Sequence, residues 1–164
     1  MNHAPKPRMR TIEIVLCGLF AALVAVGAFI RITLPTQPYP FTFSLQWLFV
    51  LLAGMLLGAK LGAMSVCAYV LIGLVGVPVF VHGGGPQYIF RAGFGFLLGF
   101  CLAAFLIGLL VEKLPRFDTL GEKRPFLSEL SRLMIPAVVG LCAYYFVGIA
   151  YYYLMYTYVL TTPA

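Results

Sequence analysis

Long apolar segments constrain this chain more than any other feature of its sequence. Hydrophobic residues make up 62% of its 164 residues, whereas charged residues make up only 10%. A soluble globule of this size needs more polar surface than that, and about 20 consecutive apolar residues form a helix long enough to cross a bilayer. The sequence therefore predicts an integral membrane protein.

Five segments reach or approach that length. We place the spans at 12–30, 42–58, 61–81, 92–111 and 133–160. The first is too long for a signal-peptide core and is followed by Arg31 rather than by a small-residue cleavage site, so we interpret it as a retained span. Each span contains glycine or alanine and none alternates with period two, which favours helices over a β-barrel. The predicted fold is an all-α bundle of five transmembrane helices, forming a single domain over 1–164.

Basic residues are distributed unevenly between the two ends of these spans. Nine of the 11 lie in the N-terminal tail, after the second span or after the fourth: Lys6, Arg8, Arg10, Lys60, Lys113, Arg116, Lys123, Arg124 and Arg132. Only Arg31 and Arg91 lie in the opposite loops. Because cytoplasmic loops hold an excess of lysine and arginine, we predict a multi-pass protein of the cell membrane with a cytoplasmic N-terminus. The net charge of +6 belongs to this inner face and does not support nucleic-acid binding.

Residue types suited to catalysis or metal binding are sparse. The acidic residues of the spans are Glu13 and Glu112, at the predicted cytoplasmic ends, and the only histidines are His3 and His82. No GxxxxGK[ST] phosphate-binding loop is present. The cysteines lie in four different spans without CxxC spacing, so we interpret them as small buried hydrophobic residues. They are Cys17, Cys67, Cys101 and Cys142. We expect no enzyme, no metal site and no cofactor.

Polar side chains gather in two segments on the predicted outer side. The first runs from Arg31 to Gln46, and its prolines, Pro35, Pro38 and Pro40, hold an extended path towards the membrane. Gln46 lies about one turn inside the second span, where its amide needs a partner. That partner is either a neighbouring backbone carbonyl or a polar ligand.

The second outer segment runs from His82 to Gly95. Three successive glycines, with Gly84 in the middle, let the backbone approach a ligand or simply turn between helices. Tyr88 and Phe90 supply apolar surface next to Arg91, a combination suited to a small molecule with a ring and a carboxylate. The alternative is that Arg91 reaches towards lipid headgroups and the aromatic residues form an interfacial belt, as we expect for the tyrosines of the last span.

Small residues at four-residue spacing let helices approach closely in lipid. For the second and fourth spans we predict contacts within the bundle through Gly54, Gly58, Gly95, Gly99 and Ala103. The first span carries a face of small residues that packs within the bundle or docks a different membrane subunit. This face consists of Gly18, Ala21, Ala22 and Ala25.

Several short stretches together form a recognisable pattern. They are Leu34-Pro35, Pro40-Phe41-Thr42, Leu45-Gln46, Leu52 to Ala63, Tyr69, Gly73 to Phe80 and Gly93 to Phe100. This pattern strongly resembles the BioY family, the biotin-binding S components of energy-coupling factor (ECF) vitamin transporters. The resemblance implies six transmembrane helices, so that the natural chain continues beyond Ala164, as the odd number of spans also suggests. It further implies a prokaryotic membrane, an outward-facing biotin cavity, a transmembrane coupling subunit (EcfT) and two cytoplasmic ATPase subunits.

The resemblance also assigns roles to individual residues. Gln46 and nearby backbone are expected to bind the ureido ring, and Tyr88 and Phe90 to flank the apolar part of biotin. Arg91 is the first choice for the carboxylate and Arg31 the second. The remaining expected ligand-binding residues are Phe41, Thr42 and Gly84. The small-residue face of the first span would contact the coupling subunit.

Three other functions remain open at this point. The chain could be an S component for another small vitamin, a membrane-embedded enzyme acting on lipid, or an assembly subunit without a ligand.

The uneven charge distribution makes a direct prediction about topology. In a variant without native cysteines, a cysteine introduced into the 112–132 connection should react with a membrane-impermeant reagent only from the cytoplasm. A cysteine introduced into 83–89 should react only from outside. The opposite pattern of labelling would contradict the predicted orientation.

Overall fold

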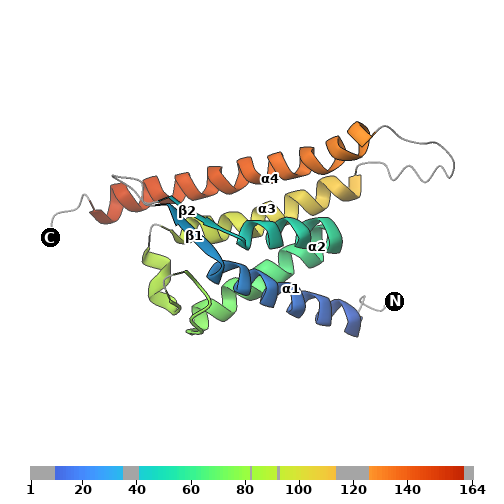
Figure 1. The fold of residues 1–164 in the computed structure, drawn as a ribbon. Helices are drawn as coiled ribbons and strands as arrows, with labels where there is room; N and C mark the ends of the chain where they lie inside the picture. Colours follow the sequence, from blue (N-terminus) through green and yellow to red (C-terminus); the bar gives the residue numbers. More distant parts are fainter. Residues whose placement is uncertain (1–9, 35–40, 82, 92, 114–125, 161–164) are drawn as a thin grey trace, which may run out of the picture.

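The computed structural model describes residues 10–34, 41–81, 83–91, 93–113 and 126–160. Within them the chain is a helical bundle with one small hairpin of strands (Figure 1). The helices are α1 (Thr11–Phe29), α2 (Gln46–Val75), α3 (Phe94–Lys113) and α4 (Phe126–Met155), with two short elements, the 3₁₀-helix η1 (Pro86–Phe90) and the π-helix η2 (Tyr156–Leu160). The predicted fold class, a helical membrane bundle, is confirmed.

Four helices of the described chain are long and apolar enough to cross a membrane. Their spans are Thr11–Phe29, Gln46–Val75, Phe94–Lys113 and Leu133–Tyr158. Three of these ranges overlap the predicted spans at 12–30, 92–111 and 133–160. The spans expected over 42–58 and 61–81 correspond to the two legs of α2, which meet at the non-helical residue Gly58.

Helix α2 reverses its direction at Gly58, where the backbone adopts φ 79° and ψ −177°. A side chain at Gly62 would lie only 2.8 Å from the carbonyl oxygen of Ala53, a residue that would be about 13 Å away in a straight helix. The teal and green halves of α2 accordingly fold back on each other in Figure 1. The two legs, 46–57 and 59–75, are about 18 and 26 Å long. The helix therefore breaks at Gly58 and restarts at Ala59.

Glu112 of α3 stabilises this reversal from outside the helix. Its Oε1 accepts a hydrogen bond of 2.9 Å from the backbone N–H of Ala59, the first residue after Gly58. A helix that restarts leaves N–H groups without intrahelical partners, and such groups are costly to leave unpaired in lipid. The carboxylate therefore caps the second leg of α2.

Glycines set the spacing of α3 against its two neighbours. A side chain at Gly54 would lie 2.8 Å from the carbonyl oxygen of Ala104, and one at Gly99 would lie 2.8 Å from that of Tyr144. Ala103 is fully buried. The predicted contacts of small residues within the bundle are confirmed at these positions.

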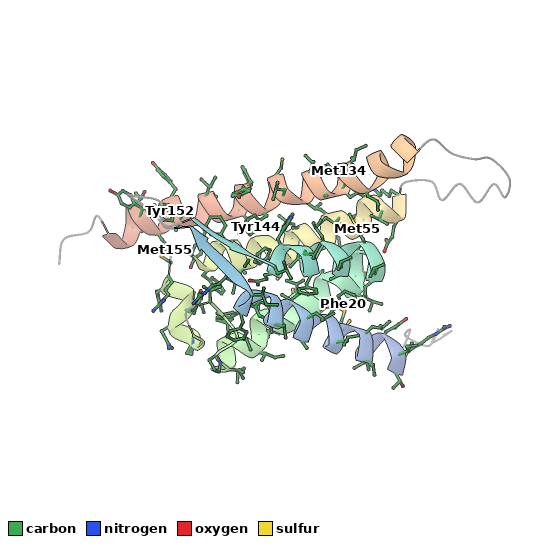
Figure 2. The ribbon with its side chains drawn as sticks, in the orientation of Figure 1. Phe20, Met55, Met134, Tyr144, Tyr152 and Met155 are labelled. Atoms are coloured by element: carbon green, nitrogen blue, oxygen red, sulfur yellow. The ribbon has the colours of Figure 1, made fainter. Side chains whose placement is uncertain are left out.

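The buried core lies where α1, α2 and α3 meet. Phe20 lies on the side of α1 that faces α2, and Tyr144 lies between α4 and α3 (Figure 2). Val24, Val50 and Val66 are completely buried. Many large apolar side chains stay exposed on the outer faces of the helices, as expected for surfaces that meet lipid. Two cysteines are among the exposed residues, so the expectation that all four are buried is wrong for Cys67 and Cys142 and holds for Cys17.

A two-stranded hairpin connects α1 to α2. Strand β1 (Arg31–Leu34) pairs antiparallel with β2 (Phe41–Ser44), and Arg31 stands opposite Ser44. The extended backbone predicted for this segment is present as paired strands. The pairing provides hydrogen-bond partners for backbone N–H and C=O groups that a single extended strand would leave unpaired. The prolines expected to shape it, Pro35, Pro38 and Pro40, lie outside the described residues.

Charged residues are separated between the two ends of the bundle. Arg10, Glu13, Lys60 and Glu112 share one cleft at the end where α1 begins and α2 reverses. Arg31 and Arg91 lie at the other end, beside the hairpin and η1. The separation matches the predicted grouping for these residues, while most of the other basic residues lie outside the described ranges.

The backbone conformation at Gly58 predicts a sharp difference between two glycines. Gly58→Ala should lower the free energy of unfolding in detergent by about 1–3 kcal/mol, because this region of φ and ψ is almost restricted to glycine. Gly18→Ala is the matched control, since Gly18 is helical with no neighbouring atom within 4 Å of an added Cβ. It should be neutral or slightly stabilising. Equal stability of the two variants would contradict the assigned strain.

Candidate ligand-binding site

A cavity of about 200 Å³ lies at the end of the bundle that holds the hairpin. Residues from β1, β2, α2, α3, α4 and the α2–α3 connection contribute to it: Arg31, Ser44, Gln46, Val81, Tyr88, Gly93, Phe96, Leu97, Phe100 and Tyr144. The cavity is therefore assembled from most of the length of the chain. Its lining combines a few polar groups with a mainly aromatic wall, which is the usual composition of a small-molecule site.

Gln46 is the buried polar group of this cavity. Its side chain is only 3% exposed, and its Nε2 makes no hydrogen bond of normal geometry with the residues that the structure describes, although the hydroxyl of Tyr69 lies near enough to interact with it weakly. The close approach of α1 holds this position in place, because a side chain at Gly27 would lie 2.9 Å from the Cα of Gln46. A buried donor without a partner costs about 1–3 kcal/mol. A bound acceptor would recover that energy.

Arg31 supplies a positive charge to the same cavity. Its Nη1 donates a 3.0 Å hydrogen bond to the carbonyl oxygen of Val81, which joins the hairpin to the α2–α3 connection. A guanidinium has five N–H donors, so this bond leaves others for an acceptor in the cavity. Ser44, directly opposite Arg31 in the hairpin, adds a hydroxyl.

Aromatic rings form a firm wall on the α3 and α4 side. Phe100 stacks on Tyr144 with ring centroids 4.7 Å apart, and Phe96 lies 5.3 Å from the same tyrosine. Trp47 supports this group from behind, 5.3 Å from Tyr144. Such contacts limit ring motion, so the wall presents a preformed apolar surface.

Tyr88 closes the cavity from η1. It packs 4.6 Å from Phe80, and the guanidinium of Arg91 lies 5.7 Å from its ring centroid on another side. Burial raises the pKa of the Tyr88 hydroxyl, while the charge of Arg91 acts in the opposite direction. The hydroxyl therefore stays protonated at neutral pH and can donate a hydrogen bond.

The structure brings together three of the predicted site residues, Arg31, Gln46 and Tyr88. Arg91 is not one of the lining residues. Its guanidinium contacts the ring of Tyr88, and Tyr88 lines the cavity. Phe90 is 72% exposed and does not line the cavity.

The other three predicted site residues, Gly84, Phe41 and Thr42, are not among the residues that line the cavity. Gly84 packs against the carbonyl oxygens of Val77 and Gly73, so it serves the chain turn rather than the lining. Phe41 and Thr42 belong to β2, but their side chains lie outside the described residues.

Sequence reasoning missed much of the aromatic wall. Tyr144 was assigned to a belt with the other tyrosines of the last span, yet it lines the cavity. Phe96 and Phe100 have the i, i+4 spacing of one helix face, and this spacing was the available signal for them. Nothing in the sequence distinguished Tyr144 from its neighbours, because only the packing of α4 on α3 selects it.

The fold and this cavity define a multi-pass membrane protein with a small, partly polar pocket at one end of a helical bundle. The chain belongs to the BioY family, whose sequence profile it matches over residues 1–164.

Two biotin transporters of the family are similar to this chain in sequence. The chain is 42% identical to the probable biotin transporter BioY of Lysinibacillus sphaericus over 143 residues, which cover 87% of this chain and 65% of that protein. It is 46% identical to the biotin transporter BioY of Thermotoga maritima over 106 residues, covering 64% and 60% of the two chains. The chain thus spans less than two thirds of the length of these relatives.

A solved structure has a similar fold. The crystal structure of an S-component for biotin from an ECF-type ABC transporter superposes with a TM-score of 0.67 at 25% identity. The superposition covers 88% of this chain and 75% of the other.

Proposed function

We propose that this chain binds biotin in the cavity beside the hairpin and acts as the substrate-binding subunit of an ECF-type transporter. The observation that carries this proposal is the buried amide of Gln46, whose Nε2 makes no hydrogen bond of normal geometry among the described residues and has only a weak interaction with the Tyr69 hydroxyl. A side chain held in this state is suited to a ligand that brings its own carbonyl oxygen. The names of the family's relatives and of the solved structure supply the identity of that ligand.

The chemistry of biotin matches the cavity group by group. Its ureido ring has a carbonyl oxygen and two N–H groups, which complement an amide such as that of Gln46. Its sulfur-containing ring and alkyl chain are apolar and suit the surface formed by Tyr88, Phe100 and Tyr144. Its carboxylate needs a cation or several donors when it leaves water, and Arg31 is the cation in the lining.

Arg31 is supported over Arg91 as the partner of the carboxylate. Both lie at the correct end, but only Arg31 contributes to the cavity lining. Arg91 acts through its contact with Tyr88. The proposed orientation places this end outside and the N-terminus in the cytoplasm, as the uneven distribution of basic residues requires.

The proposed partners are a transmembrane coupling subunit and two cytoplasmic ATPases, in a prokaryotic cell membrane. The outer surface of α1 supports the first of these. Gly18 and Ala22 are exposed, and no atom lies within 4 Å of a Cβ added to Gly18. Ala21 is only 4% exposed and Ala25 packs against the core, so the docking face we propose is narrower than the four residues expected. ATP hydrolysis would take place in the ATPase subunits.

Replacing the unpaired amide tests the proposed function. Gln46→Leu should weaken biotin binding about ten- to a hundredfold in calorimetric titration, because a bound polar group then loses its partner. The melting temperature of the ligand-free protein should stay equal or rise. Gln87→Leu is the matched control, since Gln87 is an exposed glutamine at the same end that bonds Gly84 outside the lining. A destabilised Gln46→Leu protein with unchanged affinity would mean that the amide is structural.

Acid and amide forms of the ligand distinguish the two arginines. Arg31→Ala should weaken biotin about ten- to a hundredfold and biotin amide much less, because a charged hydrogen bond is worth roughly 1.5–3 kcal/mol. Arg91→Ala should affect both ligands alike and mildly. Equal losses of acid and amide in Arg31→Ala would assign this residue to the bond with Val81 alone, and an acid-specific loss in Arg91→Ala would move the carboxylate site there.

A bulky residue on the proposed docking face tests the partner assignment. Ala22→Trp should abolish co-purification with the coupling subunit, because a large side chain prevents close helix approach, while biotin binding by the isolated protein remains. Ala150→Trp, at an exposed alanine of α4, is the control and should assemble normally. Normal assembly of Ala22→Trp would place the partner elsewhere.

A further inference from the structure

Tyr69 is a buried tyrosine of α2 that lies beside the ligand cavity. It is only 2% exposed and is not one of the lining residues. Its hydroxyl donates a 3.2 Å hydrogen bond to the backbone carbonyl of Val79, in the connection between α2 and α3. A phenol has a single O–H group, so this bond leaves the oxygen of Tyr69 able only to accept further hydrogen bonds.

The side chain of Gln46 lies within reach of the Tyr69 oxygen. The interaction is weak, since Nε2 of Gln46 makes no hydrogen bond of normal geometry among the described residues. An amide can turn either its C=O or its NH2 group towards a neighbour, and the other hydrogen bonds of that neighbour decide between the two. An oxygen that can only accept favours the NH2 group. The Gln46 amide therefore turns its N–H donors, rather than its carbonyl, towards Tyr69.

Aromatic packing holds the Tyr69 ring in this position. The ring of Phe80 stands edge-on to it, with the two centroids 5.5 Å apart, and the same ring lies 4.6 Å from that of Tyr88. Phe80 is itself only 1% exposed, and a side chain at Gly73 would overlap its ring. The Tyr69 hydroxyl therefore has little freedom to move to another acceptor.

The carbonyl that accepts the Tyr69 hydroxyl belongs to a well-anchored segment of backbone. Two residues later in the chain, the carbonyl of Val81 accepts the hydrogen bond from Arg31. Phe80, which lies between these two carbonyls in sequence, exchanges two backbone hydrogen bonds of 3.0 and 3.1 Å with Gly83. The acceptor of the Tyr69 hydroxyl is thus fixed by the backbone around it.

We propose that Tyr69 is a positioning residue that fixes the orientation of the Gln46 amide and so makes the cavity selective for a ligand carbonyl. One N–H of Gln46 is directed to the Tyr69 oxygen, which leaves the other for an acceptor in the cavity. A ligand with a donor at the same point would meet a second donor, and a buried donor without an acceptor is unfavourable. This inference rests on the proposed function, in which the ureido carbonyl of biotin is that acceptor.

Two ligands that differ at one atom test the selectivity. Tyr69→Phe keeps the ring and removes the hydroxyl, and calorimetric titration measures the affinities for biotin and for 2-iminobiotin, in which an imino N–H donor replaces the ureido oxygen. Tyr69→Phe should weaken biotin about three- to tenfold. The affinity for 2-iminobiotin should stay the same or rise, because an amide that is no longer held can turn its carbonyl towards the donor. The preference for biotin should therefore fall.

A double-mutant cycle tests whether Tyr69 acts through Gln46. In a protein that carries Gln46→Leu, the addition of Tyr69→Phe should cause no further loss of biotin affinity, because no amide is left to orient. Tyr151→Phe is the matched control. Its hydroxyl also donates to a backbone carbonyl, that of Ile89, and Tyr151 does not line the cavity. This variant should leave both affinities unchanged.

Three results would overturn the inference and leave the proposed function in place. Equal weakening of biotin and 2-iminobiotin by Tyr69→Phe would mean that the hydroxyl is only structural. An undiminished effect of Tyr69→Phe in the Gln46→Leu protein would mean that it does not act through the amide. Unchanged affinities in Tyr69→Phe would mean that it orients nothing. Absence of biotin binding by the unaltered protein would instead contradict the proposed function, and this inference with it.

Discussion

The reversal of α2 at Gly58 is the constraint on which the packing of the bundle depends, and the hydrogen bond from Ala59 N–H to Glu112 stabilises it. A membrane helix that reverses direction exposes backbone groups to an environment without water, and each unpaired group costs several kcal/mol. Gly58 permits the required backbone conformation, and Glu112 pairs a donor at the point where the second leg restarts. At the other end of the first leg, Gln46 lies beside Gly27 of α1 and lines the cavity.

The two ends of the bundle differ in how their polar groups are used. At the end where α1 begins and α2 reverses, the carboxylates of Glu13 and Glu112 accept hydrogen bonds from backbone N–H groups and stabilise the starts of two helices. At the hairpin end, the buried Gln46 makes no hydrogen bond of normal geometry through its Nε2 among the described residues, a state that is unfavourable for folding. Unfavourable local energies of this kind tend to occur at functional sites, where a ligand recovers the cost. This difference is the physical reason for placing the proposed biotin site at the hairpin end.

Contacts among the aromatic rings on one side of the cavity restrict the motion of its lining. Phe96, Phe100 and Tyr144 contact one another across α3 and α4, and Gly99 lets the backbones of these helices approach closely. A preformed wall lowers the entropic cost of ordering side chains on binding. The Arg31 bond to Val81 has a related effect, because it connects the hairpin and the α2–α3 connection, which both border the cavity.

The sequence alone determined the membrane class, the approximate helix ranges and the separation of the described charges, and it singled out Gln46, which lines the cavity. Apolar length, basic residues and an isolated amide are local properties of the chain. It also carried the family pattern. Only the tertiary structure decided which arginine lines the cavity, since Arg31 and Arg91 lie at the same end of the bundle and only Arg31 belongs to the lining. The same holds for Tyr144, and for the neighbours Ala21 and Ala22 of α1, of which the first is buried and the second exposed. In a chain that is apolar on every helix face, composition does not distinguish core from lipid contact, and packing between helices makes that choice.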